Sequence, residues 1–235
     1  MRSWKTIRTT NMQAVILAAG KGLRLRPITE SVPKALVDVC GTPLIFHILN
    51  SLPSTVTEIF VVVGYLGDQI RATIGDAFDG KAVRYVTQDP LDGTGSALHL
   101  LKDELRGKFL VVNGDDLYGK DDLNRLARHD LAVLVAPTED TIGSTAVVDV
   151  AGMFVEIRND STVAPRLRVC GAYVLDETFF DHRLATVTVH DKTEYSLPHT
   201  IVAMAREHAI ATEVATHWRP VGTHEELARV RATCV

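Results

Sequence analysis

The chain has 235 residues, of which 46% are hydrophobic and 23% are charged, and its formal net charge is −4. This is the composition of a globular protein that can build one substantial core, or one large and one small lobe. The negative charge argues against a protein that binds nucleic acid or anionic membranes, because both kinds of binding gain affinity from basic residues.

Residues 1–11, MRSWKTIRTTN, precede the first apolar run. They are basic and lack the apolar core of a signal peptide, so we predict a loose N-terminal extension. No apolar run in the sequence approaches the roughly 20 residues that a membrane-spanning helix needs. These features favour a cytoplasmic protein.

From residue 12 onwards, short apolar runs alternate with stretches in which apolar residues recur at helical spacing. The runs predict buried strands at residues 13–20, 58–65, 81–88, 108–116 and 131–137. The stretches between them predict helices at residues 42–52, 67–78, 93–105 and 121–129. This repeated strand–helix–strand pattern is typical of a doubly wound, mostly parallel α/β sheet with helices on both faces. Such sheets bind ligands beyond the carboxyl ends of their strands, so the loops that follow these strands should share one rim.

The pattern changes near residue 140. Strand-like runs at residues 144–150, 153–159 and 167–175 have no long helices between them. Two helices, predicted at residues 196–208 and 223–231, flank a last strand within residues 209–218. We therefore predict a single domain over residues 12–235, in which a smaller mixed lobe (138–235) folds against the rim of the larger part (12–137).

Cysteine and histidine spacing gives no sign of a metal site. Cys40, Cys170 and Cys234 are widely separated and odd in number, with no C-x-x-C pair. They predict reduced thiols of a cytosolic protein, rather than a disulfide framework or a zinc site. The 9 histidines show no ligand spacing either.

Residues 17–37, LAAGKGLRLRPITESVPKALV, are the least ordinary stretch of the chain. Glycines after a buried strand let backbone N–H groups approach a phosphate, and Lys21, Arg24, Arg26 and Lys34 add positive charge. Two common phosphate loops are excluded, because no Ser or Thr follows a Gly-Lys pair and the third glycine of the dinucleotide fingerprint is absent. A triphosphate site explains the composition better than the alternative, a solvated surface loop with scattered charge.

The run LAAGKGLRLRPIT, followed by PKALV, resembles the signature of the sugar-1-phosphate nucleotidylyltransferases, or sugar-nucleotide pyrophosphorylases. The resemblance continues through VVVGY, TQDPLDGTGSAL, NGDD, GAYVLD and WRPVGTHEEL, and so covers nearly all of residues 12–232. It implies a Rossmann-like fold of the nucleotide-diphospho-sugar transferase type, here as the N-terminal catalytic domain without a hexapeptide-repeat extension. The implied reaction joins a nucleoside triphosphate to a sugar 1-phosphate and releases pyrophosphate. Because the sugar phosphate attacks the α-phosphorus in line, this reaction requires no protein nucleophile.

The resemblance also implies roles for individual residues. It places Arg24 on the triphosphate, Lys34 near the reacting phosphates, and Asp115 on Mg²⁺, a hard cation that prefers carboxylate oxygens. Taken alone, the NGDD run would also fit a turn with solvated acids. The implied nucleotide-binding residues are Leu17, Ala18, Ala19, Gly20, Gly22, Gln88, Gly93 and Thr94. A glutamine at position 88 matches relatives that read uracil or thymine, which favours UTP, then dTTP, with GTP as the remaining option.

The sugar-phosphate side departs from the family pattern. Asn-Asp-Ser at residues 159–161 stands where members usually have Glu-Lys-Pro, whose lysine holds the sugar phosphate. Arg158 is the predicted substitute, because residues 158 and 160 of a strand point to the same face. Arg166 and Arg168 are the other candidates.

Further departures concern the metal and the sugar. Pro220 replaces a second metal-binding aspartate, and Val169 and Cys170 occupy the position of an asparagine that contacts the sugar. Gly143 and Gly171, with Arg158, form the predicted sugar-phosphate site.

Two functional classes remain open at this point. The first is an active nucleotidylyltransferase for an atypical sugar phosphate, and the second is a nucleotide-binding regulatory protein with weak transfer activity. The enzyme is favoured because Arg24, Lys34 and Asp115 all remain, whereas binding alone can dispense with some of them. The expected partners are a nucleoside triphosphate and a sugar 1-phosphate, without nucleic acid or membrane, and a homo-oligomer is an open option.

Overall fold

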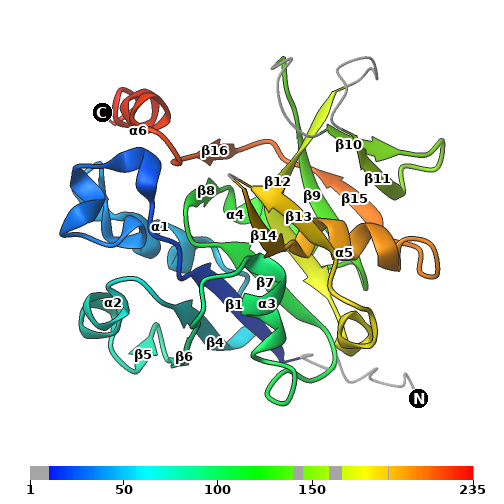
Figure 1. Ribbon diagram of the computed structural model, residues 1–235, viewed down its shortest axis with the longest axis horizontal. Helices are drawn as coiled ribbons and strands as arrows, with labels where there is room; N and C mark the ends of the chain where they lie inside the picture. Colours follow the sequence, from blue (N-terminus) through cyan, green and yellow to red (C-terminus); the bar gives the residue numbers. More distant parts are fainter. Residues whose placement is uncertain (1–10, 140–144, 159–165, 190, 235) are drawn as a thin grey trace, which may run out of the picture.

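The computed structural model describes residues 11–139, 145–158, 166–189 and 191–234. Its centre is a 10-stranded sheet with the main order β11-β10-β12-β7-β1-β4-β6-β5 (Figure 1). The two remaining strands lie off this order: β9 pairs with β12, and β15 pairs with β9. The strands are β1 (Met12–Ala18), β4 (Val56–Val63), β5 (Ala77–Phe78), β6 (Lys81–Thr87), β7 (Phe109–Asn113), β9 (Ala132–Pro137), β10 (Thr145–Val148), β11 (Phe154–Arg158), β12 (Leu167–Leu175) and β15 (Ala211–Val214). Strands β7, β1, β4 and β6 run parallel to one another, which confirms the predicted parallel core.

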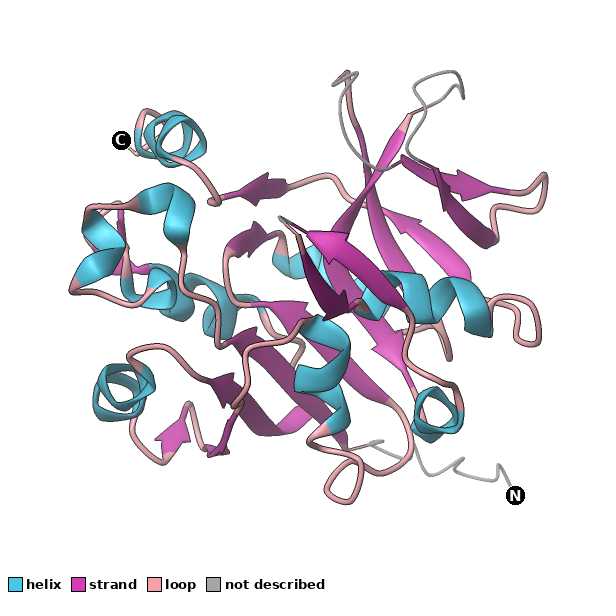
Figure 2. Cartoon of the chain, in the orientation of Figure 1, coloured by secondary structure: helices cyan, strands magenta, loops and turns pink. Residues whose placement is uncertain are grey.

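Helices cover both faces of this sheet (Figure 2). They are α1 (Leu44–Ser51), α2 (Gly67–Ile74), α3 (Thr94–His99), α4 (Lys120–Leu126), α5 (Leu197–Met204) and α6 (His224–Arg231). Neighbouring residues of β1 enter different cores: Ile16 shares one with Ile48 of α1, and Val15 shares the other with Leu98 of α3. A strand buried on both sides needs apolar residues at every position, which explains the continuous apolar run of β1. The predicted doubly wound arrangement is confirmed.

Strand β12 sets the arrangement of the second half of the chain. It pairs antiparallel with β9 on one side and, on the other, with β10 near its start and with β7 near its end. As a result, β9 runs in the same direction as β7 but is not its neighbour. The strands after residue 140 therefore belong to the main sheet. Strand β12 pairs with the parallel core, β10 pairs with β12, and β11 pairs with β10.

Short elements surround the sheet and were only partly predicted. The small strands are β2 (Asp38–Val39), β3 (Thr42–Pro43), β8 (Asp116–Tyr118), β13 (Thr186–Val189), β14 (Lys192–Tyr195) and β16 (Trp218–Pro220). The 3₁₀ turns are η1 (Leu23–Leu25), η2 (Ile28–Glu30), η3 (Lys34–Leu36) and η4 (Glu177–Asp181). The β13–β14 hairpin was not predicted, although the TVTV run of β13 has the polar–apolar alternation of a strand. Within the described ranges, no helix is long and apolar enough to cross a membrane.

Cys40 and Cys234 form a disulfide, with Cα atoms 5.5 Å apart. This corrects the prediction of three reduced thiols: among these cysteines only Cys170 is free, and it is buried. Cys40 lies between β2 and β3, whereas Cys234 follows α6, so the bond joins positions separated by 194 residues. Sequence spacing gives no sign of a contact over such a distance.

Cys234→Ser is expected to lower the free energy of unfolding by about 2–5 kcal/mol, because the cross-link restricts the unfolded chain. Denaturant titration without a reducing agent measures this loss. The same titration with a reducing agent is the control, since it should bring the parent down to the stability of the variant. Equal stability of the two proteins without reductant would contradict a stabilising disulfide.

Candidate functional site

The carboxyl ends of the parallel strands lie at one edge of the sheet. In the strand register, Leu17 of β1 is the partner of Asn113 of β7, and Ala18 is the partner of Val63 of β4. Backbone hydrogen bonds hold the following loops together: Gly114 donates to Leu17 O (2.8 Å) and Tyr65 donates to Ala19 O (3.1 Å). The predicted shared rim is confirmed.

The loop after β1 folds back on itself through three consecutive 3₁₀ turns, η1 to η3. Gly22 has a φ of 62°, and a Cβ at this position would lie 3.0 Å from Thr29 and 3.1 Å from Lys34. The hydroxyl of buried Thr29 donates to Gly22 O at 2.8 Å. Gly20 is exposed, and a Cβ added there would meet nothing within 4 Å. A glycine at position 22 thus lets Lys34 come close to the start of its own loop.

Lys34 and Asp115 form the most direct contact between two predicted catalytic residues. The Lys34 Nζ lies 2.5 Å from Asp115 Oδ2. The lysine side chain is 11% exposed and the aspartate side chain is 37% exposed. Asp115 therefore remains open to solvent on one side, while Lys34 is held in place by packing.

Arg24 approaches the same region from η1. Its side chain lies beside Gly222, where an added Cβ would be 2.8 Å from Arg24 Nη2. Gly222 N also donates to Glu226 Oε2 of α6 at 2.8 Å. The last turn of the chain before α6 thus contacts the arginine of the glycine loop, so residues about 200 positions apart in sequence meet at the rim.

Asp116 is buried and lies in a different environment from Asp115. Burial, and then the nearby charge of Asp115, raise the pKa of the Asp116 carboxyl well above its usual range. The hydroxyl of Tyr118 lies 3.5 Å from Asp116 Oδ2 and also donates to the carbonyls of Cys170 and Gly171 at 3.1 Å. This tyrosine was not predicted as a site residue, although its alternation with Asp116 in the strand after NGDD places both side chains on one face.

Strand β16 closes this side of the rim. Pro220 pairs with Asp116 in the β8–β16 ladder, and Val221 N donates to Asp115 O at 3.1 Å. The position at which the resemblance expects a second carboxylate is therefore next to the two aspartates.

The candidate sugar-phosphate residues lie in different surroundings. The Arg168 guanidinium stands 5.6 Å from the centre of the Trp218 ring, and its charge acts to lower the pKa of Asp116. Arg158, on β11, forms an ion pair with Glu156 of the same strand. Gly171 has a φ of 68°, and Asn113 occupies the space in which its Cβ would lie. Gly143 and residues 159–161 fall outside the described residues, as does the side-chain direction of Asp160 relative to Arg158.

The predicted base-reading loop is held together by Gln88. This side chain is buried, and its Nε2 donates to Gly93 O (2.9 Å) and to Ser96 Oγ (3.0 Å). Gly93 has a φ of 119°, and the backbone of Tyr195 fills the space in which its Cβ would lie. Thr94 Oγ1 accepts a hydrogen bond from Leu197 N at 3.2 Å. In this structure, the Gln88 amide nitrogen therefore donates its hydrogen bonds to residues of the loop itself.

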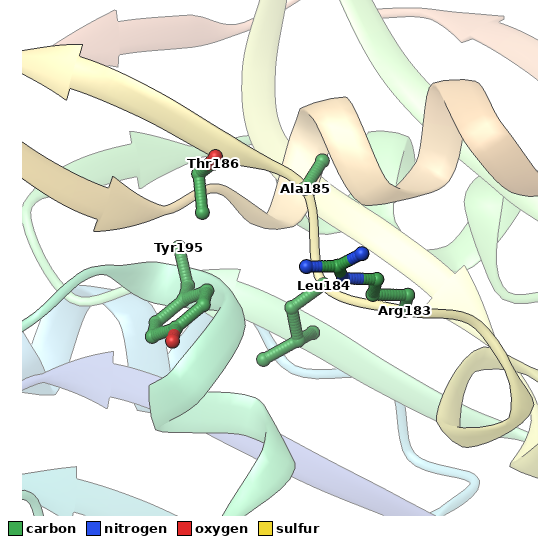
Figure 3. Close-up of a pocket in the computed structure, with 5 residues that line it drawn as sticks. All are labelled: Arg183, Leu184, Ala185, Thr186 and Tyr195. Carbon is green, nitrogen blue, oxygen red and sulfur yellow. The ribbon is translucent and has the colours of Figure 1, made fainter.

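A hollow of about 510 Å³ lies beside this loop. Figure 3 shows Arg183 and Leu184 on the segment that precedes β13, with the Tyr195 ring facing them from β14. Ala185 and Thr186 complete the lining. Neither Lys34 nor Asp115 lines it, so it is separate from the charged part of the rim.

Comparison with protein families finds a match that covers more than half of this chain. The family model described as "Nucleotidyl transferase" matches residues 13–147, which contain the glycine loop, Lys34 and Asp115.

Similar proteins agree with this match. The chain is 30% identical over 216 residues to the bifunctional protein GlmU of Methanococcus aeolicus, covering 90% of this chain and 51% of that protein. It thus spans about half the length of that relative. It is also 30% identical to the UTP–glucose-1-phosphate uridylyltransferase AglF of Haloferax volcanii, covering 83% of this chain and 84% of that protein.

A solved structure supports the fold. The crystal structure of a putative glucose-1-phosphate thymidylyltransferase from Bacillus anthracis superimposes with a TM-score of 0.80, covering 95% of each chain. The two sequences are 24% identical. This likeness establishes the shared architecture of the sheet and its helices.

Proposed function

Because the chain belongs to the nucleotidyl transferase family, we propose that it transfers a nucleotidyl group from a nucleoside triphosphate to a sugar 1-phosphate. In this reaction an oxygen of the sugar phosphate forms a bond to the α-phosphorus. The bond between that phosphorus and the pyrophosphate oxygen breaks, and the products are a nucleoside diphosphate sugar and pyrophosphate. The relative named as a UTP–glucose-1-phosphate uridylyltransferase supports this class of reaction.

The observation that carries the proposal is the Lys34–Asp115 contact, with Arg24 on the same rim. Transfer of a phosphoryl group develops charge on phosphate oxygens, and cations fixed in advance stabilise that charge without having to reorganise. Lys34 is fixed in this sense, because it is held by packing and by Asp115. In the proposed complex, the α-phosphate competes for the lysine Nζ that Asp115 holds in this structure.

Mg²⁺ is the cofactor that we propose for this site. The donor set fits: Asp115 offers a partly exposed carboxylate, and Mg²⁺ is usually held by one or two carboxylates together with substrate phosphates and waters. When bound, the ion would neutralise phosphate charge. Asp116 is the less favoured ligand, because its burial disfavours the charged carboxylate.

The sugar phosphate is assigned to Arg168 in this proposal, in preference to Arg158. Arg168 lies over Trp218, and its charge reaches Asp116, whereas Arg158 is paired with Glu156 on β11. The two strands are separated by β10. Arg168 is thus the candidate nearer to the two aspartates.

Arg168→Ala is expected to raise the KM for the sugar phosphate by about tenfold to a hundredfold, because a hydrogen bond to a charged group contributes roughly 1.5–3 kcal/mol. The KM for the nucleotide should change little. Arg158→Ala is the matched control and should leave both constants near the parent values. The reverse outcome, with Arg158→Ala as the damaging change, would return the role to Arg158.

The substrates are proposed as UTP or dTTP together with an atypical sugar 1-phosphate. The direct test measures pyrophosphate release from each of the nucleoside triphosphates against a panel of sugar 1-phosphates. Release that depends on both substrates supports the enzyme. Tight nucleotide binding without pyrophosphate release in any combination would favour the alternative, a regulatory nucleotide-binding protein. Pro220, at the position of the family's second metal-binding aspartate, is the reason to test this alternative.

A further inference from the structure

The structure brings together three potential metal ligands that the sequence does not show as a cluster. His182 follows η4, whereas Glu207 and His208 lie in the turn after α5. The ligand atoms of these three side chains all lie within 4.8 Å of one another. The two imidazole rings stand edge to face, with their centres 5.7 Å apart.

The backbone that carries these side chains is held by hydrogen bonds to buried residues. The N–H groups of Glu207 and His208 both donate to Met204 O at 2.9 Å, which fixes the turn to the last residue of α5. Met204 is fully buried. On the other segment, His182 N donates to Phe179 O at 3.3 Å, and Phe179 is also fully buried. The two segments therefore present their ligands from anchored positions.

Within the described ranges, no other contact competes for these three side chains. Among the described residues, none of them forms a side-chain hydrogen bond or an ion pair, and the two imidazoles contact each other. Both histidines are partly exposed and Glu207 is exposed, so an ion from solvent can reach them.

The chemistry of the set selects the type of ion. Two imidazole nitrogens and one carboxylate oxygen suit Zn²⁺, whereas Mg²⁺ and Ca²⁺ prefer ligand sets made of oxygen alone. Ligands of a tetrahedral zinc ion with bonds near 2.1 Å stand about 3.4 Å apart. Rotation about the side-chain single bonds of these solvent-accessible residues can bring the ligand atoms from within 4.8 Å to that separation.

We propose that His182, Glu207 and His208 form a Zn²⁺-binding site with three protein ligands and a fourth position for water. The site is separate from the proposed nucleotide site: α5 lies at the right of Figure 1 and the 3₁₀ turns of the glycine loop at its left. A bound ion would join the end of η4 to the end of α5.

Isothermal titration of the full chain with Zn²⁺, without chelator or reducing agent, tests the site. Under these conditions Cys40 and Cys234 stay paired and Cys170 is buried, so thiols do not compete. We expect one ion per chain, and at least a tenfold weaker dissociation constant in His182→Ala and in His208→Ala. Visible absorption of bound Co²⁺ gives a second readout, since a four-coordinate ion gives an intense band that should be lost in both variants.

Two variants serve as controls. His129→Ala removes a histidine whose Nε2 lies 3.2 Å from Glu213 Oε2. This pair offers only two metal ligands, and Glu213 already forms an ion pair with Arg125, so zinc binding should not change. Asp115→Asn tests whether the zinc occupies the proposed magnesium site instead, and binding should again be unchanged. The proposal is overturned if the parent binds no Zn²⁺ up to about 1 mM, which corresponds to a binding free energy weaker than −4.1 kcal/mol. Unchanged binding in both folded His182→Ala and His208→Ala would also overturn it.

Discussion

Lys34→Ala is expected to lower the turnover number by more than about 10²-fold, with little change in the fold. The side chain provides a cation that is already in place where the phosphate charge develops, and water cannot replace it without reorganising. Its partner Asp115 keeps 37% of its side chain exposed, so solvent can compensate the aspartate left behind. Steady-state pyrophosphate release, together with a thermal unfolding curve, separates the loss of chemistry from a loss of stability.

Lys21→Ala is the matched control for this prediction. Lys21 lies in the same loop and carries the same charge, but it is exposed and forms no ion pair within the described part of the chain. Its removal should change turnover only a few-fold, which would show that the loop's net charge is not what matters. Similar losses in both variants would assign the effect to general attraction of the triphosphate rather than to a positioned lysine.

The central part of the fold could be predicted because local sequence determines it. The apolar run of β1 needs two covered faces, and Ile16 and Val15 are indeed buried on opposite sides. Parallel strands end at one edge by geometry, so the position of the Gly22 loop and Asp115 at a common rim followed from the strand pattern alone. Lys34 could be identified from its motif, and the structure places it in contact with Asp115.

Features that depend on pairing between distant segments could not be predicted in this way. Nothing local to β12 says that it inserts between β7 and β9, because its apolar run would fit any buried strand. The same holds for Cys40 with Cys234, and for His182 with His208, since the fold alone brings each pair together. Periodicity predicts what an element is, whereas these contacts depend on where it lies.

Asp115→Asn is expected to lower activity by about 10³-fold or more, because holding a metal ion at the phosphates contributes several kcal/mol and each 1.36 kcal/mol is tenfold in rate. Asparagine has nearly the same shape and can still accept a hydrogen bond from Lys34, so the fold should survive. What disappears is the fixed negative charge that holds Mg²⁺. Asp121→Asn, at an exposed position of α4, is the matched control and should retain full activity.

The response to Mg²⁺ concentration distinguishes a metal ligand from a residue that only positions Lys34. A lost ligand should move the Mg²⁺ dependence of pyrophosphate release to higher concentrations, whereas a misplaced lysine should lower the rate at every concentration alike. Asp116 is next in the chain, but it is expected not to replace Asp115, because it is buried and burial disfavours a charged carboxylate there. Since substrate phosphates complete the coordination, Mg²⁺ should bind to the parent measurably only when nucleotide is present. Full activity of Asp115→Asn at low Mg²⁺ would show that the reaction does not depend on a metal at this carboxylate.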